Sequence, residues 1–171
     1  MEIATAIRER RSIRAYQATP VEKEKLALIL EAGRLSPSAR NRQEWRFIVV
    51  KERGTREKLA QAANGKHFVA EAPLIIVACA TGAEYVLACG QPASTVDTSI
   101  AFAYMILQAH ELGLGTCWLG SFNATAVKEI LGIPPQVQVV AMTPLGYPAQ
   151  APTPTPRKPL AEVVCYERYS P

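Results

Sequence analysis

The sequence has few of the residues that most often carry catalysis or bind metals. Its 171 residues include two histidines, His67 and His110, and four cysteines without C-x-x-C spacing. A structural zinc site, an iron–sulfur cluster or a disulfide framework is therefore not expected. The sequence also lacks the G-x-S-x-G, H-E-x-x-H and G-x-x-x-x-G-K-[ST] motifs, which argues against the hydrolase, metalloprotease and P-loop classes. We predict no metal site.

Long apolar runs and a dominant charge are missing as well. No stretch reaches the ~18 apolar residues that a membrane span needs. The segment 1–14 carries four arginines and two glutamates rather than an apolar signal, so a cytoplasmic location is expected. The net charge is only +4, and basic residues cluster at 8–14 and 157–158. That distribution suits one small anion better than a nucleic acid.

The length of the chain predicts a single domain over residues 1–171, and hydrophobic periodicity predicts its helices and strands. A helix is expected over 2–10, and a second one runs from a Thr19-Pro20 start to a stop at Gly33. Further helices are expected with caps at Thr55, at Ser94 with Asp97, and at Asn123, the last stopping at Gly132. Predicted strands cover 46–51, 72–80, 113–122, 137–142 and 160–169.

The C-terminal part contains six prolines between 144 and 159, which predicts an extended segment. The strand-like residues 160–169 that follow include valines that need burial. We therefore expect residues 148–171 to form an arm that packs on a partner subunit. The alternative is a tail that folds back on its own domain.

The remaining polar features suit a phosphorylated cofactor with a polar ring, such as a flavin. Arg10, Arg14 and Arg157 can supply bidentate donors for a phosphate, with the Ser12 hydroxyl adding a shorter bond. The turn around Gly120 lets backbone N–H groups approach a ring closely. Taken alone, the arginine cluster is weak evidence, because such a cluster is more commonly a solvated basic surface.

The order of these motifs along the whole chain resembles the nitroreductase family of FMN enzymes. The resemblance lies in RRSIRAY at 10–16, SPSARNRQEWRFIVV at 36–50, Asp97, LQAHELGLGTCWLGSF at 107–122, LGYP at 145–148 and PRKPLAEVV at 156–164. One departure is Glu44, because the family commonly has a proline there. The resemblance implies an α+β fold with a mixed sheet flanked by helices. It also implies an intertwined homodimer with FMN at the subunit interface.

The resemblance also implies which residues bind the cofactor. Matched by motif, they are Arg10, Arg11, Ser12 and Arg14 for the phosphate, ribityl chain and ring edge; Ser38, Ala39 and Asn41 for a loop lent to the other subunit's flavin; Leu119, Gly120 and Ser121 for the turn beside N5; and Arg157 and Lys158 for late phosphate contacts. No side chain is assigned as catalytic, because the flavin performs the chemistry.

The implied function is a ping-pong oxidoreductase. Hydride passes from NADH or NADPH to flavin N5 and then to a nitroaromatic, a quinone or a free flavin. Three alternatives stay open: another reaction on the same scaffold (dehalogenation, dehydrogenation or flavin cleavage), a non-catalytic flavin carrier, and a nucleic-acid binder. The stretch between Ala80 and Ser94 is short, which predicts little lid, an open pocket and loose specificity.

Overall fold

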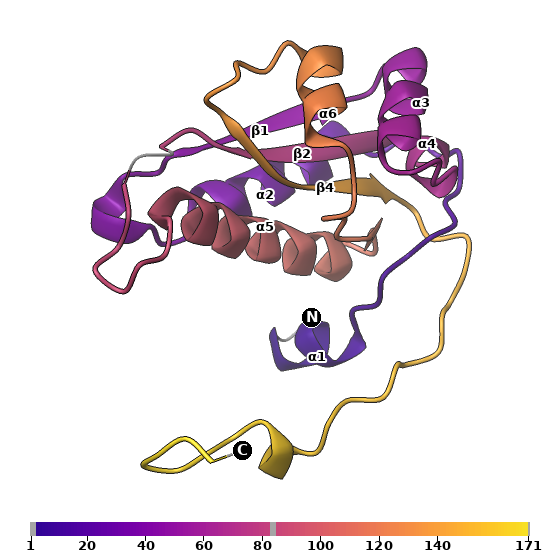
Figure 1. Ribbon diagram of the computed structural model, residues 1–171. Helices are drawn as coiled ribbons and strands as arrows, with labels where there is room; N and C mark the ends of the chain where they lie inside the picture. Colours follow the sequence, from indigo (N-terminus) through magenta and orange to yellow (C-terminus); the bar gives the residue numbers. More distant parts are fainter. Residues whose placement is uncertain (1–2, 83–84, 171) are drawn as a thin grey trace.

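Four strands form one sheet, and helices cover both of its faces (Figure 1). The computed structural model describes residues 3–82 and 85–170. The strands are β1 (Trp45–Val50), β2 (Leu74–Ala80), β3 (Gly115–Thr116) and β4 (Gln138–Gly146), in the order β1-β2-β4-β3. These strands pair antiparallel, and a single bridge between Ser12 and Thr116 is parallel. The predicted α+β class is confirmed.

Strand β2 is buried along its whole length because helices pack on both of its faces. Alternate side chains point to opposite sides of a strand. Ile75 and Val77 accordingly pack in one core cluster, and Ile76 and Ala78 pack in another. The covering helices are α2 (Lys23–Arg34), α3 (Arg53–Ala62), α5 (Ala93–Glu111) and α6 (Ala124–Leu131), with the shorter α1 (Ile3–Glu9) and α4 (Phe68–Glu71). Within the described ranges, no helix is long and apolar enough to cross a lipid bilayer.

The starts of the helices follow the predictions only in part. α6 is confirmed: the Asn123 side chain accepts from the Ala126 N–H, and Gly132 ends the helix in a left-handed conformation with φ 64°. Helix α2 begins at Lys23 rather than at the predicted Thr19-Pro20 start. The predicted cap at Thr55 is wrong, because the Glu52 carboxylate accepts from the first amides of α3.

The predicted cap formed by Ser94 and Asp97 is also wrong. α5 starts at Ala93, and Asp97 binds a loop amide elsewhere in the chain. The Ser94 hydroxyl is buried inside the helix, without a hydrogen-bond partner among the described residues. A sequence pattern for a cap fails here because a competing tertiary contact engages the carboxylate.

Two strand predictions need correction. The expected strand over 113–122 is reduced to Gly115–Thr116 and an isolated bridge between Leu119 and Met142. The expected strand over 160–169 is wrong, because this segment holds a 3-10 turn, η2 (Leu160–Glu162). Strand residues need backbone hydrogen-bond partners. Among the described residues of one chain, no strand of the sheet pairs with this segment. Every residue from 153 to 163 is exposed.

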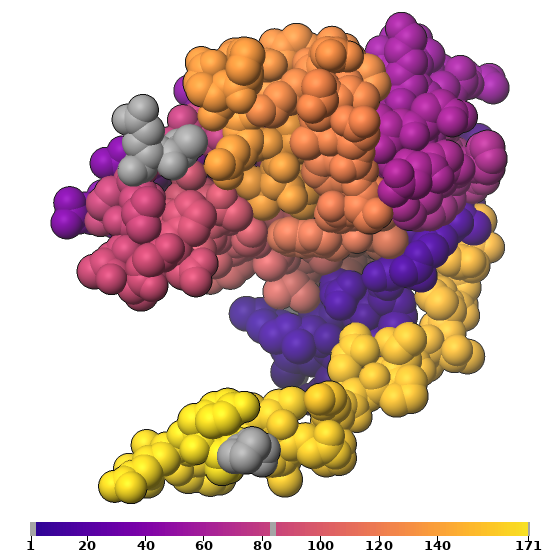
Figure 2. All heavy atoms as spheres, in the orientation of Figure 1, coloured from indigo at the N-terminus to yellow at the C-terminus, as the bar shows by residue number. Residues whose placement is uncertain are grey.

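The C-terminal arm has a fixed root and then leaves the body of the molecule (Figures 1 and 2). At the root, the Gln17 N–H donates to the Tyr147 carbonyl at 2.9 Å, and the Ala149 N–H donates to the Ala15 carbonyl at 2.9 Å. The Tyr147 hydroxyl also donates to the Glu22 carboxylate and accepts from Lys25 Nζ at 2.6 Å. The direction in which the arm departs is therefore set by the domain itself.

Candidate functional site

The segment that follows α1 lies alongside β3. Ser12 pairs with Thr116, and the Ile13 N–H donates to the Thr116 carbonyl at 2.8 Å. Ile13 is buried against Gly115, where a Cβ would lie 2.7 Å from the Ile13 side chain. The glycine therefore permits the close pairing. Because neighbouring side chains alternate in extended backbone, burying Ile13 directs Ser12 and Arg14 to the opposite side.

Four polar groups act on the thiol of Cys117, which directly follows β3. Burial raises the pKa of Cys117, while the charges of Arg14, Arg10 and Lys66 and a hydrogen bond from Ser12 act in the opposite direction. These groups therefore lie close enough together to act on one atom. Three cations and a hydroxyl in the same region favour the binding of an anion there. Three of the four residues are among those predicted.

The turn at Gly120 and Ser121 borders this cluster. Asn64 Nδ2 donates to Ser121 Oγ at 3.0 Å, and Lys66 Nζ lies 3.4 Å from the Ser121 carbonyl oxygen. Leu119 is buried and holds the turn to β4 through its bridge with Met142. A Cβ at Gly120 would meet no atom within 4 Å. The backbone at this turn is therefore open to a ligand.

Sequence reasoning missed Asn64 and Lys66. They lie in the connection between α3 and α4, where Asn64 has φ 60° and Gly65 has φ 69°. The Asn-Gly pair is a turn signal, and it could have marked a polar loop. It could not have shown that this loop meets residues 117–121, because that contact depends on how α3 packs on the sheet.

Arg11 has a structural task in this chain. Its Nη1 atom donates to the carbonyls of Arg8 at 2.6 Å and Arg10 at 2.8 Å, which occupies carbonyls at the end of α1. A cation at a helix C-terminus is favourable there. Of the predicted arginines in this segment, Arg10 and Arg14 are better placed than Arg11 to meet an anion with their side chains.

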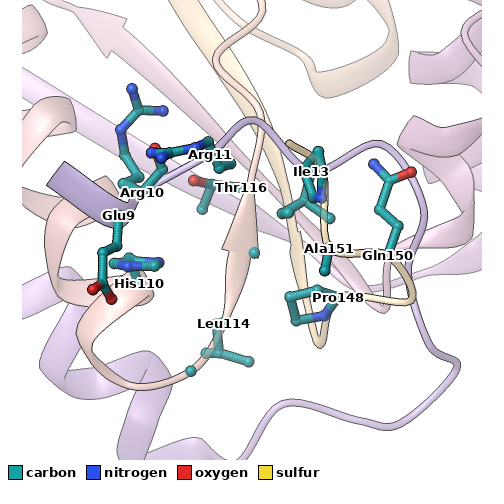
Figure 3. Close-up of a pocket in the computed structure, with 13 residues that line it drawn as sticks. Glu9, Arg10, Arg11, Ile13, His110, Leu114, Thr116, Pro148, Gln150 and Ala151 are labelled. Carbon is teal, nitrogen blue, oxygen red and sulfur yellow. The ribbon is translucent and has the colours of Figure 1, made fainter. Parts of the chain in front are cut away.

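A hollow of about 350 Å³ lies between the end of α1, β3 and the root of the arm. Figure 3 shows Arg10, Arg11 and His110 on one side of it and Pro148 and Gln150 on the other. Burial lowers the pKa of His110, and its Nε2 atom has no hydrogen-bond partner among the described residues. Arg10 thus adjoins both this hollow and the cluster around Cys117.

The predicted loop with Ser38, Ala39 and Asn41 lies elsewhere. It forms the turn η1 (Ala39–Asn41), and the Ala39 N–H donates to Asp97 Oδ2 at 3.0 Å, near the start of α5. β3 lies beyond the other end of this 19-residue helix, which spans roughly 28 Å. Within one chain the structure therefore does not bring this loop together with Arg10 and Ser12.

Arg157 and Lys158 lie on the exposed arm. Arg157 Nη1 donates to Thr155 Oγ1 at 2.9 Å and lies 3.4 Å from the Pro156 carbonyl oxygen. These partners are local, so the single chain does not bring Arg157 to Arg10. Their convergence on one phosphate stays a prediction.

Comparison with known proteins agrees with this arrangement of elements. The model of the Nitroreductase family matches residues 7–88 and 63–147. The chain belongs to the nitroreductase family. Similarity to a curated protein extends over nearly its full length: it is 32% identical to an NADH dehydrogenase of Thermus thermophilus over 97% of this chain and 96% of that protein.

Two further comparisons concern flavin enzymes. The chain is 29% identical to an FMN reductase [NAD(P)H] of Bacillus subtilis, over 98% of this chain and 74% of that protein. Among solved structures, an FMN-dependent nitroreductase of Clostridium difficile superposes with a TM-score of 0.86. It is 31% identical, over 97% of this chain and 99% of the other. Both the sequence and the fold therefore support membership in the nitroreductase family.

Proposed function

We propose that this protein is an FMN-dependent oxidoreductase that takes reducing equivalents from NADH or NADPH and passes them to a nitroaromatic, a quinone or a free flavin. The observation that supports this most strongly is the cluster of Arg10, Ser12, Arg14 and Lys66 beside the open turn at Gly120. It combines cations for an anionic group with accessible backbone for a polar ring. Relatives with flavin-reductase and FMN-dependent nitroreductase descriptions point the same way.

The residues present fit FMN by the chemistry of their donors. In this proposal Arg10 and Ser12 hold the phosphate and ribityl chain, joined by Arg157 and Lys158 of the arm. Arg14 and Lys66 place positive charge at the ring edge, where the reduced ring carries negative charge. Leu119, Gly120 and Ser121 present backbone to the ring. When bound, FMN supplies the redox chemistry by accepting hydride at N5 and releasing it to the acceptor.

The loop with Ser38, Ala39 and Asn41 serves the flavin of a second subunit in this proposal. Its separation from Arg10 by the length of α5 supports that assignment, because one FMN cannot extend that far. The exposed apolar side chains of α1 and α5, which include Ile3 at 77%, Ile7 at 59% and Tyr104 at 45% exposure, supply area for a homodimer interface.

Turnover in this proposal is ping-pong: the donor leaves before the acceptor enters the same open site. No side chain needs to act as a general acid. The exposed faces around Gly120 and the short connection between β2 and α5 leave the ring accessible to acceptors of different shapes.

The test begins with the purified protein. We expect a yellow protein that releases FMN on denaturation, is bleached by NADH or NADPH in anaerobic stopped-flow experiments, and is reoxidised by a quinone. Replacing Arg10 with alanine should lower FMN affinity about ten- to hundredfold, because a charge-assisted contact contributes roughly 1.5–3 kcal/mol. Fluorescence titration of FMN measures this.

The matched control is Arg8→Ala, an exposed arginine on α1 two residues before Arg10, which should keep wild-type FMN affinity. A colourless protein that does not bind added FMN, or that retards DNA at low salt instead, would refute the proposal. Unchanged FMN titrations in the Arg10 variant would refute the phosphate assignment alone.

A further inference from the structure

Two arginines and a tyrosine form a cluster beside the loop that carries Ser38, Ala39 and Asn41. The guanidinium carbons of Arg40 and Arg42 lie 5.2 Å and 4.8 Å from the centroid of the Tyr85 ring. Contacts of this kind attract a cation to the ring face and also hold the side chain in place. Both arginines are exposed, and the tyrosine is half-buried.

Glu44, the residue at which this chain departs from the family pattern, joins the two segments of the cluster. Its carboxylate pairs with Arg42 at 2.5 Å, and its carbonyl accepts from the Thr81 N–H at 3.1 Å. It also occupies the space beside Gly82, where a Cβ would lie 2.0 Å from the carboxylate. The loop and the segment after β2 are thus held together through Glu44.

The charges in the cluster are unequal. Arg42 is balanced by Glu44, whose pKa is lowered by the hydrogen bond from that guanidinium. No carboxylate among the described residues pairs with Arg40. Among the described residues, Arg40 therefore carries a positive charge that no carboxylate balances, and its side chain lies over an aromatic ring.

The backbone of Arg40 is held in an uncommon conformation. Its φ of 54° and ψ of 24° lie in the left-handed region, which is unfavourable for a non-glycine residue. Its neighbour Ala39 is fixed by Asp97, and the Ser38 hydroxyl accepts from the Gln43 N–H at 3.1 Å. The loop is therefore preorganised, with Arg40 between Ala39 and Asn41, two of the three loop residues proposed to contact a flavin.

We propose that Arg40, held in place by Tyr85, binds an anionic group of a molecule that reacts at the neighbouring flavin. This inference rests on the proposed function and deepens it, because it selects charged reactants at an otherwise open site. The group is a phosphate, carboxylate or sulfonate, for which a guanidinium is the preferred side-chain donor. It belongs either to the nucleotide donor, as a 2′-phosphate, or to an acidic acceptor.

The experiment compares the holoenzyme with Arg40→Gln and with the matched control Arg53→Gln, an exposed arginine on α3. Calorimetric titration with adenosine 2′,5′-bisphosphate and with AMP measures binding of the nucleotide anion without turnover. Steady-state kinetics give kcat/KM for NADPH against NADH, and for a naphthoquinone sulfonate against menadione. Tyr85→Leu and Tyr85→Phe test the aromatic contact.

If the anion comes from the donor, Arg40→Gln lowers the bisphosphate-to-AMP affinity ratio and the NADPH-to-NADH ratio about three- to tenfold. If it comes from the acceptor, the sulfonate-to-menadione ratio falls by a similar factor. In either case Tyr85→Leu shifts the same ratio in the same direction, Tyr85→Phe restores it, and added salt weakens the wild-type preference.

The inference is overturned if the affinity and kcat/KM ratios are the same in the wild type, Arg40→Gln and Arg53→Gln. It is also overturned if Arg40→Gln only lowers the melting temperature and leaves these ratios unchanged. A wild-type protein that binds no FMN or does not turn over refutes the proposed function instead. The bisphosphate titration then still decides whether Arg40 binds an anion.

Discussion

Two buried cysteines illustrate how neighbours decide what a single side chain can do. Cys79 lies in β2 among apolar residues, and burial raises its pKa to about 11. Cys117 is buried to a similar degree, but Arg14, Ser12 and Lys66 act against the effect of burial on its pKa. One thiol therefore belongs to the core alone, and the other marks the edge of a charged site.

The thiol of Cys79 should make the protein less stable at alkaline pH. Its pKa in the folded protein is about 11, against an ordinary value of 9.0. The contribution is therefore complete below pH 9 and is lost as pH rises through 11. Two pKa units correspond to at most about 2.7 kcal/mol. Urea unfolding of the wild type and Cys79→Ala from pH 8 to 11 should show a flatter pH dependence in the variant. Parallel curves would contradict this origin.

At the scale of elements, local signals were sufficient where the structure is decided locally. The Asn123 cap and the Gly132 stop correctly placed α6, and the apolar run correctly placed β2, because its covered faces need no polar residues. The predictions failed where a distant contact intervenes. The Asp97 carboxylate accepts from the Ala39 N–H instead of capping α5, and Glu52 rather than Thr55 caps the start of α3.

The candidate site was predictable to a similar extent. Ser12 and Arg14 were found from their motif, and the structure places them at the cluster around Cys117. Lys66 was missed because its role arises only when the connection between α3 and α4 packs beside Ser121. Arg11 could not be distinguished from Arg10 by motif, since its capping of α1 depends on the side-chain geometry.

The contact between Asp97 and Ala39 should control the order of the loop that η1 forms. A charged acceptor for a backbone N–H contributes roughly 1.5–3 kcal/mol, so Asp97→Ala should speed hydrogen exchange of the Ala39 amide about tenfold or more. FMN affinity should fall about five- to tenfold, because the loop must then be ordered on binding. Asp97→Asn retains an acceptor oxygen and should recover much of both effects. Wild-type exchange at Ala39 in Asp97→Ala would contradict the role.

For the whole molecule, the site residues lie in two groups that one chain keeps apart. The residues near Cys117 lie beyond the end of α5, and the loop with Ser38 lies near its start. An antiparallel arrangement of two chains along α5 would bring the start of one helix to the end of the other. The loop with Ser38 of each chain would then lie beside the residues near Cys117 of the other chain, at two equivalent sites. The family resemblance implied that the loop with Ser38 serves the other subunit's flavin, but residue patterns alone did not show the separation within one chain, because it depends on the length and placement of α5.

The arm should stabilise the dimer and the flavin site together. A truncation after Gly146 would also remove Tyr147, which binds Glu22 and Lys25, so ending the chain after Pro152 is the sharper change. It keeps the root hydrogen bonds of Tyr147 and Ala149 and removes only the exposed part. The prolines of the arm limit its freedom before docking, and Val163, which is 62% exposed in the single chain, would gain burial worth up to about 2 kcal/mol.

We therefore expect the protein shortened after Pro152 to dissociate at higher concentration than the full chain in sedimentation velocity, and to hold less FMN at equal protein concentration. The weakening of the dimer and the loss of FMN should occur together, since ligand binding and subunit association at a shared site are thermodynamically linked. Val163→Asp in the full chain should act in the same direction, whereas Thr153→Ala, an exposed position near the root, should not. A shortened protein that stays dimeric, yellow and active would show that the arm carries neither function.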